Sequence, residues 1–480
     1  IKTIRRTSNI GELMIILGTN SIKDTGYDVA NSLRFNSGSS ENLTKTPSSA
    51  SNRKTFTFSF WFKRSKLGVT QTLFCAGVYN STVFSQLYID SSDKLFFQGY
   101  DNAGNQNASL NTSDMVFRDV SAWYHIVVEV DTTQATSSNR VKIYVNNSQI
   151  TFGTNNYPSQ NYDYAYNNND VHKIGGRSSG NYFDGYMSEV TFIDGQQLDP
   201  TSFGEFDEDS GIWKPKDVSG LTFGTNGFYL DFEDSSALGN DKAGSNNFTV
   251  NNLTAIDQSI DSCTNNFATL NSLNVPTSNA PTFSEGNLQS ISSSSASGSF
   301  GGSSSIGVSS GKWYIEAKAL FSGHTQAAIG VTYNDAETAR TNNDATDSYE
   351  YIYRANGNKI HDNSASSYGD TYTTNDIIGI AIDLDNHKIY WSKNGTFQNS
   401  GDPTTGATGT GSAFDLDTGQ TYMFFHQDNT GASSNTSSFS FNFGSPAFSI
   451  SSGNTDGNGY GNFEYAVPSG YFSLNTKNLA

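Results

Sequence analysis

The stretch IGIAIDLDNHKIYWSKNG, which covers residues 378–395, decides the fold class of this 480-residue chain. Apolar and polar side chains alternate on both sides of its Asp385-Asn386 turn. Two earlier stretches, WYHIVVEV (123–130) and VKIYVNN (141–147), repeat the pattern. Alternation with period two, closed by Asp and Asn turns, is typical of antiparallel strands that bury one face. We therefore predict two antiparallel sheet modules in one chain.

The composition agrees with a chain built from strands and turns. Charged residues make up only 15% of the chain, whereas Gly (45), Tyr (25) and Phe (33) are abundant. Aromatic residues favour strands and glycine favours turns. Because 480 residues are more than one core usually holds, the prediction is an all-β fold. It consists of two antiparallel β-sandwich (jelly-roll) domains joined by a partly structured connector.

Changes of pattern along the chain divide it into five parts. They are an N-terminal segment (1–26), a first sandwich (27–200), a connector (201–298), a second sandwich (299–447) and a C-terminal tail (448–480). The stretch that begins at Met14 is typical of a natural start, so we expect residues 1–13 to be a conceptual translation of upstream sequence. In 55–63 four alternating phenylalanines share one face, which predicts a buried aromatic ladder. Three tryptophans are assigned to the cores: Trp123, Trp313 and Trp391.

Charge and hydropathy exclude two classes of partner. The formal net charge is −18, and no cluster of Lys and Arg lies in the predicted strands, so nucleic acid is not expected as a partner. No apolar run is long enough to span a bilayer, so membrane insertion is not expected. Cys75 and Cys263 form neither a disulfide framework nor a zinc-ligand spacing.

Several motifs carry a resemblance to known families. FSFWFK (58–63), KIYVN (142–146) and GYMSEV (185–190) resemble the concanavalin-like (laminin-G-like) jelly roll. GKWYIE (311–316), together with the stretch quoted first, resembles a SPRY (B30.2-like) domain.

The connector phrase 227–232 with 234–239 and 248–253, and the ending 465–471 with 476–479, are similar to those of structural or tail-associated proteins of marine tailed bacteriophages. This resemblance implies an adhesive protein located in the virion, the phage particle.

No catalytic residues are predicted. Glycosidases on a jelly-roll scaffold need two carboxylates that flank the sugar bond, and one strand can supply them as Glu-x-Asp-x-x-Glu. The acidic run 205–209 comes nearest, but Ser210 stands where the last acid of that pattern belongs. We therefore predict that the chain is not an enzyme. A jelly-roll glycan hydrolase with an unrecognised site is kept as an alternative.

Calcium is the one cofactor for which the sequence offers ligands. Lectin-like jelly rolls often hold calcium on loop carboxylates together with backbone and amide oxygens. Asp90 and Asp93 offer such oxygens, and the alternative is that both acids only form a turn.

Tyrosines near predicted loops are the candidate ligand-binding residues, because sugar rings stack on aromatic faces. Tyr157 and Tyr164 lie in an Asn-rich loop of the first module. In the second module, three alternating tyrosines are followed by an arginine: Tyr349, Tyr351, Tyr353 and Arg354. The alternative is that these tyrosines merely fill a sheet surface.

The resulting functional prediction is a non-enzymatic virion protein that attaches to a host surface glycan or protein through its sandwich loops. Other virion proteins are expected partners. Weak single sites gain strength through multivalency, which a homo-oligomer would supply. The rival interpretation is a purely structural capsid or tail component.

Overall fold

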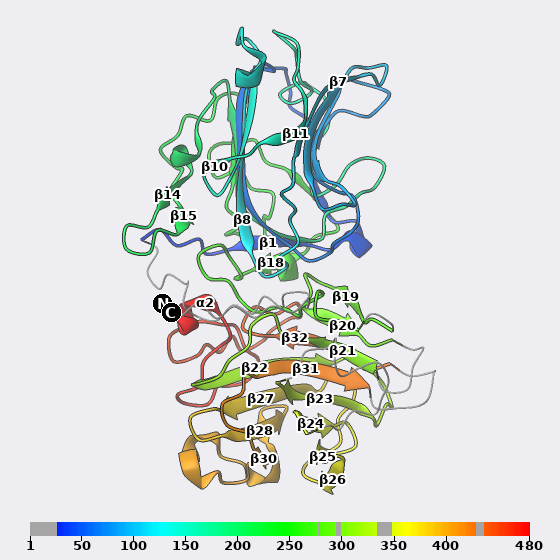
Figure 1. Ribbon diagram of the computed structural model, residues 1–480, viewed down its shortest axis with the longest axis vertical. Coiled ribbons are helices and arrows are strands. Elements are labelled where there is room, and N and C mark those ends of the chain that lie inside the picture. Colours follow the sequence, from blue (N-terminus) through cyan, green and yellow to red (C-terminus); the bar gives the residue numbers. More distant parts are fainter. Residues whose placement is uncertain (1–25, 277–278, 294–298, 334–347, 429–435) are drawn as a thin grey trace.

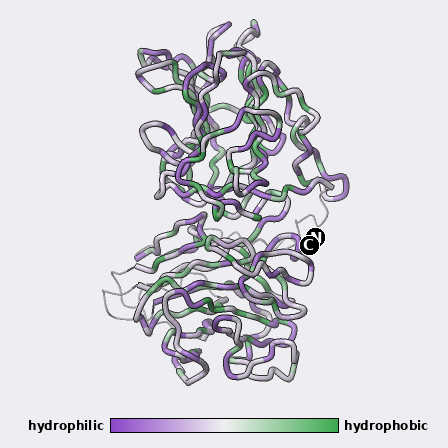
Figure 2. Tube along the Cα trace, turned by 180° about the vertical axis from the view of Figure 1, so that it is seen from behind, coloured by the Kyte–Doolittle hydropathy of each residue, from purple (hydrophilic) through white to green (hydrophobic). Residues whose placement is uncertain are grey.

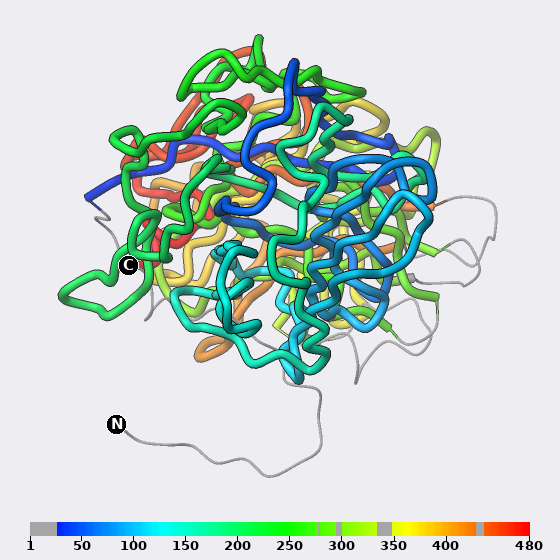
Figure 3. The backbone as a smooth tube through the Cα atoms, turned by 90° about the horizontal axis from the view of Figure 1, so that it is seen from above, coloured from blue at the N-terminus to red at the C-terminus, as the bar shows by residue number. Residues whose placement is uncertain are grey.

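The computed structural model describes residues 26–276, 279–293, 299–333, 348–428 and 436–480. Two β-sandwiches lie end to end along the long axis of the molecule (Figure 1). In the view from above, the first sandwich lies in front of the second and the two overlap (Figure 3). The predicted all-β class is confirmed. The segment 1–13, expected to be a translation of upstream sequence, lies outside the described residues.

The first sandwich is built from two sheets that we call A and B. Sheet A runs in the order β10 (Ser148–Gln149), β9 (Val141–Val145), β8 (Trp123–Asp131), β3 (Thr55–Arg64), β13 (Gly185–Asp194), β1 (Ser32–Phe35) and β18 (Gln258–Ser259), with β16 (Phe228–Leu230) beside β13. Sheet B runs in the order β11 (Phe152–Asn156), β7 (Gln106–Thr112), β6 (Leu95–Tyr100), β5 (Phe84–Ile89), β4 (Gln71–Ala76), β12 (His172–Ile174), β2 (Asn42–Lys45) and β17 (Thr249–Asn251).

The core of the first sandwich lies between these two sheets. The predicted aromatic ladder on β3 is buried there: Phe56, Phe58, Phe60 and Phe62. The predicted pair of strands also forms, since β8 and β9 pair with Val128 opposite Ile143. Hydrophobic residues run through the interiors of both sandwiches (Figure 2).

The pleat of β8 corrects one expectation. Ile126, Val128 and Val130 face the core, so Trp123 faces outward instead of lying in the core. Trp123 is half-buried, and its indole N–H donates to Asp261 Oδ1 at 3.2 Å. The other two tryptophans assigned to cores, Trp313 and Trp391, are buried in the second sandwich.

Residues that the sequence places in the connector supply strands to both sandwiches. In the first, β16, β17 and β18 extend sheets A and B; in the second, β19 (Thr282–Ser284) and β20 (Gln289–Ile291) form one edge of a sheet. The hairpin of β14 (Gly204–Phe206) and β15 (Trp213–Pro215) belongs to a segment that covers the outer face of sheet A. In that cover, Phe203 and Val218 pack against Val127 of β8.

The second sandwich is built from two sheets that we call C and D. Sheet C runs in the order β19 (Thr282–Ser284), β20 (Gln289–Ile291), β32 (Ser438–Asn442), β22 (Lys312–Ala319), β27 (Ile377–Asp383), β28 (Lys388–Lys393) and β29 (Thr396–Phe397), with β30 (Phe414–Asp415) beside β28. Sheet D runs in the order β21 (Ser299–Ser303), β31 (Met423–Asp428), β23 (Ala327–Thr332), β24 (Glu350–Arg354), β25 (Asn358–His361) and β26 (Ser364–Ser367). The stretch quoted first forms the β27–β28 hairpin.

Residues 448–480 pack over the outer face of sheet C. Phe463 and Tyr471 contact Tyr314 and Tyr390 there. Glu316, buried on β22, accepts the backbone N–H groups of residues 464 and 465 at 2.9 and 2.8 Å. Helix α2 (Thr476–Leu479) ends the chain.

The remaining elements are short 3-10 helices: η1 (Ser37–Ser39), η2 (Ser137–Asn139), η3 (Pro200–Ser202), η4 (Ala255–Asp257), η5 (Gln398–Ser400) and η6 (Pro403–Thr408). In the parts of the chain that the structure describes, no helix is both long and apolar enough to cross a bilayer.

Arg34 joins the two sandwiches. Its guanidinium is fully buried and lies 3.1 Å from Asp257 Oδ1 and 3.5 Å from Glu285 Oε2 in the β19–β20 turn. It also donates to the backbone carbonyl of Pro446 at 3.4 Å. One cation of the first sandwich therefore contacts two separate segments packed in the second.

Replacing Arg34 with Met should destabilise the protein by about 3–5 kcal/mol, because two carboxylates would be left without their buried cation. The free energy of unfolding in urea, followed by tryptophan fluorescence, measures this loss. Lys242→Met is the matched control, since the Lys242 side chain is 54% exposed and its ion pairs with Asp231 and Glu233 should contribute little. Equal losses in the two variants would contradict the importance of this junction.

Candidate functional site

The tyrosines predicted on β24 do not form a surface patch. Tyr351 and Tyr353 are 1% and 0% exposed and face the core of the second sandwich. Tyr351 stacks on His361 with ring centroids 4.1 Å apart. Because side chains alternate along a strand, Arg354 lies on the opposite face. The prediction is corrected for the two buried tyrosines, which no sugar can reach.

Tyr349, the last member of that predicted group, is half-buried, and its ring centroid lies 6.3 Å from that of Tyr333. It precedes β24, and the rings of Tyr333 and Tyr422 connect it to Tyr351. The four predicted residues of the second sandwich are therefore not brought together into one site.

The two tyrosines predicted in the first sandwich have different environments. Tyr164 is fully buried against Phe56 and Phe97 and belongs to the core, which corrects its prediction. Tyr157 is half-buried and lines a hollow of about 340 Å³ together with Lys142 and Phe152. This hollow opens between β10 and β11, the neighbouring edges of sheets A and B.

Asp90 and Asp93 are occupied by interactions within the protein. The Asp93 carboxylate is buried and lies 2.9 Å from Arg64 Nη1 and 2.8 Å from Arg118 Nε. Burial alone would raise its pKa, but the bonds from the Gly68 N–H and the two arginines hold the pKa of Asp93 below its ordinary value. Asp90 Oδ1 accepts two backbone N–H groups within its own turn.

Asp93 is therefore committed to two arginines and Asp90 Oδ1 to its own backbone, which favours the turn-forming alternative for Asp90 and Asp93 over a calcium site. Across the described ranges, no group of three or more His, Cys, Asp or Glu side chains is arranged to hold a metal ion.

The outer face of sheet B carries a repeated pattern. Two neighbouring strands, β5 and β6, both read Phe-x-Gln-x-Tyr in their outward positions. Their alternate residues, such as Leu87 and Phe97, face the core. We call the outward set the Phe-Gln-Tyr face: Phe84, Gln86, Tyr88, Phe96, Gln98 and Tyr100. The strands are antiparallel and in register, so each Phe lies opposite a Tyr and the glutamines lie opposite each other.

Hydrogen bonds fix the glutamines in the middle of this face. Gln86 Nε2 donates to Gln98 Oε1 at 3.0 Å, and Gln98 Nε2 donates to Ser109 Oγ of β7 at 3.2 Å. Tyr100 Oη donates to Gln98 Oε1 at 2.7 Å, and Arg177 Nη1 donates to Gln86 Oε1 at 3.5 Å. The polar row is thus pre-ordered across three strands.

Aromatic side chains flank this polar row on both sides. On one side Tyr88 and Phe96 stack with centroids 5.1 Å apart. On the other side Tyr100 meets the ring of Tyr79 edge-on at 5.1 Å, and Phe84 is buried beneath them. Tyr79 is 44% exposed, and the rings of Tyr88, Phe96 and Tyr100 stay partly exposed. The glutamine amides are only 5% exposed, so the accessible part of this arrangement is a set of aromatic rings that can stack on a sugar ring.

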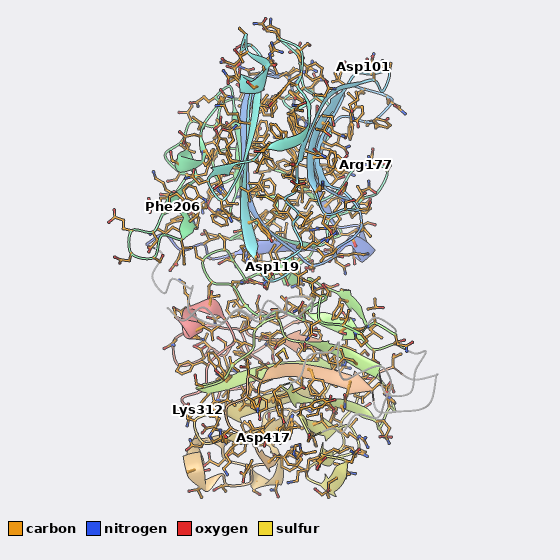
Figure 4. All side chains as sticks on the ribbon, in the orientation of Figure 1. Asp101, Asp119, Arg177, Phe206, Lys312 and Asp417 are labelled. Atoms are coloured by element: carbon orange, nitrogen blue, oxygen red, sulfur yellow. The ribbon has the colours of Figure 1, made fainter. Side chains whose placement is uncertain are left out.

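None of the six residues of this face was among the predicted site residues, although the repeat Phe-x-Gln-x-Tyr is visible in the sequence at 84–88 and 96–100. Figure 4 shows Arg177 and Asp101 on this side of the first sandwich and Phe206 on the opposite side. Cys75 of β4 lies opposite Gln86 of β5 and is buried. Burial raises the pKa of its thiol to about 12, so Cys75 is not a nucleophile.

A serine–histidine contact on the outer face of sheet A is not a catalytic pair. His125 Nε2 lies 2.9 Å from Ser59 Oγ, and the indole N–H of Trp213 donates to His125 Nδ1 at 3.0 Å. Since an indole N–H can only donate, the proton of the neutral imidazole lies on Nε2 and points toward Ser59. His125 therefore cannot accept the proton of Ser59.

Comparisons with known proteins identify two domains. Residues 36–199 match the family model of the concanavalin A-like lectin/glucanases superfamily, and residues 312–414 match the SPRY domain model. The chain therefore contains a concanavalin-like (laminin-G-like) domain and a SPRY domain, as the sequence motifs indicate. These domain types fit a carbohydrate- or protein-binding role. They are mainly binding modules, although the concanavalin-like superfamily includes glucanases.

Individual relatives are distant. The ATP-dependent RNA helicase DDX1 of Xenopus laevis is 30% identical over 92 residues, which are 19% of this chain and only 12% of that protein. A proposed carbohydrate-binding protein of Bacteroides ovatus is 17% identical, with a TM-score of 0.31, over 47% of this chain and 59% of its own. The SAP-like pentraxin of Limulus polyphemus is 16% identical, with a TM-score of 0.26, over 36% and 79%.

The buried histidine of sheet A predicts a pH dependence of stability. Burial lowers the pKa of His125 to about 3, whereas a histidine in an unfolded chain has a pKa of about 6.5. Between these values the unfolded chain binds one proton more than the native state, so stability falls as the pH falls from about 6.5 towards 3. His125→Gln should reduce the slope by up to about 1.4 kcal/mol per pH unit. Urea titrations at pH 4–7 measure it, and an unchanged slope would contradict this assignment.

Proposed function

We propose that this chain is a non-enzymatic glycan-binding protein whose Phe-Gln-Tyr face is the sugar-binding surface. One observation carries the proposal: the same Phe-x-Gln-x-Tyr pattern occurs on two paired strands. The pairing creates a polar row with aromatic rings on both sides. A concanavalin-like domain is a setting in which such a surface is expected.

The physical argument concerns rings and hydroxyl groups. The apolar faces of sugar rings would stack on the partly exposed rings of Tyr88, Phe96 and Tyr100. The amides of Gln86 and Gln98 are each only 5% exposed, and Gln98 holds the Tyr100 ring in place by accepting its Oη–H. The amides are already held by neighbours, so little side-chain entropy is lost when a sugar binds. Rigid strands hold these side chains more firmly than loops would.

The same surface favours binding over hydrolysis. Glycoside hydrolysis needs two carboxyl groups about 5–9.5 Å apart. The eight described strands of sheet B contain no Asp and no Glu. A ligand on this face would therefore meet no acid from those strands and would be held without being cleaved.

We further propose that this binding attaches a tailed-phage particle to a glycan on the host surface. The similarity of 227–232, 234–239 and 248–253, and of 465–471 and 476–479, to phage structural proteins supports this proposal. The SPRY domain would then contact other virion proteins or a host protein. Immunogold labelling of phage particles tests the location, and an unlabelled particle would overturn it.

Removing the aromatic rings should weaken binding. Tyr88→Ala and Tyr100→Ala should each lower glycan affinity on the order of 10-fold, about 1.4 kcal/mol, because each removes a stacking surface. Tyr88→Phe should retain most of the affinity, since it keeps the ring. A glycan array identifies the ligand, and titration calorimetry with that ligand measures the change.

Phe206→Ala is the matched control for these variants. Phe206 is 54% exposed and lies on the opposite side of the first sandwich (Figure 4). Its loss should leave affinity unchanged. Wild-type binding by the two Tyr→Ala variants, with their folding confirmed by thermal unfolding, would move the site elsewhere, and the hollow beside Tyr157 would be the next candidate.

A further inference from the structure

Sheet B differs from the other three large sheets in its charges. The chain contains 46 acidic residues, yet none lies in the eight described strands of sheet B. Each of the other large sheets has an acid in a strand, for example Glu129 in sheet A, Glu316 in sheet C and Glu350 in sheet D. The contrast matters because the chain as a whole carries a net charge of −18.

Two cations lie on the outer face of this acid-free sheet. Lys173 of β12 faces outward, because its neighbours His172 and Ile174 face the core. In the strand register, Lys173 lies opposite Cys75 of β4, and Cys75 lies opposite Gln86 of β5. Within the described residues Lys173 makes no ion pair. Arg177 contacts Gln86 at the centre of the Phe-Gln-Tyr face.

The acids nearest to this face lie at the ends of its strands. Asp90 follows β5 and Asp101 follows β6. Asp101 Oδ1 accepts the N–H groups of Ala103 and Asn105, and Asp90 binds its own turn in the same way. Both carboxylates are therefore directed into turns at the rim, and the centre of the face is cationic.

We propose that the Phe-Gln-Tyr face binds an anionic polysaccharide, with Arg177 and Lys173 contacting its carboxylate or sulfate groups. This inference rests on the proposed glycan-binding function and specifies its ligand class. A charge-assisted bond from a guanidinium or an ammonium group selects an acidic sugar over a neutral one of the same shape.

The register indicates a chain and not a single terminal sugar. One continuous row of outward-facing positions crosses six strands, from Lys173 through Cys75, Gln86, Gln98 and Ser109 to Asn156. Its four central members are only 2–5% exposed, so a ligand along the row would rest on the flanking aromatic rings and on the two ends. At a strand spacing of about 4.8 Å this row is about 24 Å long. It ends next to Tyr157, which lines the hollow at the sheet edge. Several consecutive sugar residues fit this length.

Nucleic acid is the other anionic polymer that aromatic rings and cations could hold. Its phosphates need a concentrated basic footprint. Here two cations face the ligand in a chain of net charge −18. A polysaccharide with spaced charges matches this density better, so the polysaccharide is the ligand we infer.

The test uses the full chain on an array of acidic and neutral polysaccharides, with single-stranded RNA as a separate probe. Bound glycans should be carboxylated or sulfated, and reducing the carboxyl groups or removing the sulfate should lower binding at least 10-fold. Lys173→Gln with Arg177→Gln should do the same, and raising the salt concentration should weaken binding by the wild type but not by this double variant. Lys66→Gln, an exposed cation between β3 and β4, should behave like the wild type.

The outcomes separate this inference from the proposed function. Binding to neutral polysaccharides with no effect of the two substitutions would overturn the anionic ligand and leave glycan binding standing. Silence of the whole array would overturn both. Tighter binding to RNA than to any glycan would show that the ligand is a nucleic acid and not a polysaccharide.

Discussion

The alternation of side chains along each strand is the constraint on which this structure depends. In β3 it places four phenylalanines in the core, and in β5 and β6 it places a second set of residues on the outer face. A shift of one residue in the β5–β6 pairing would exchange Gln86 for Leu87 and destroy both the core and the polar row. The same register therefore holds the first sandwich together and builds its candidate binding surface.

The chain covers two of its sheet faces with its own residues. The segment with β14 and β15 packs on sheet A, and residues 448–480 pack on sheet C. Both covers bury apolar side chains such as Val127 and Tyr314, which would otherwise meet water. Sheet B keeps partly exposed aromatic rings on its outer face. Partly exposed aromatic rings beside covered faces are typical of a binding surface.

The sequence predicted the fold better than the site. Period-two patterns are local, so the all-β class, the aromatic ladder and the two hairpins followed from neighbouring residues. Tyr351, Tyr353 and Tyr164 were misjudged because alternation shows which residues share a face but not which face is buried. The turn at Asp90 and Asp93 was open to two interpretations, and the arginines that bind Asp93 come from distant segments.

Placing a binding surface on strands instead of loops has a physical consequence. A loop loses conformational freedom when it binds a ligand. Gln86 and Gln98, in contrast, are already hydrogen-bonded to each other, to Ser109 and to Arg177. Under the proposed function, such a surface would gain little by closing around a ligand and would bind each sugar residue weakly. Its strength must come from length, that is, from several sugars along one row and from several copies of the chain acting together. A long, charged, repetitive ligand is the kind of molecule for which that design works.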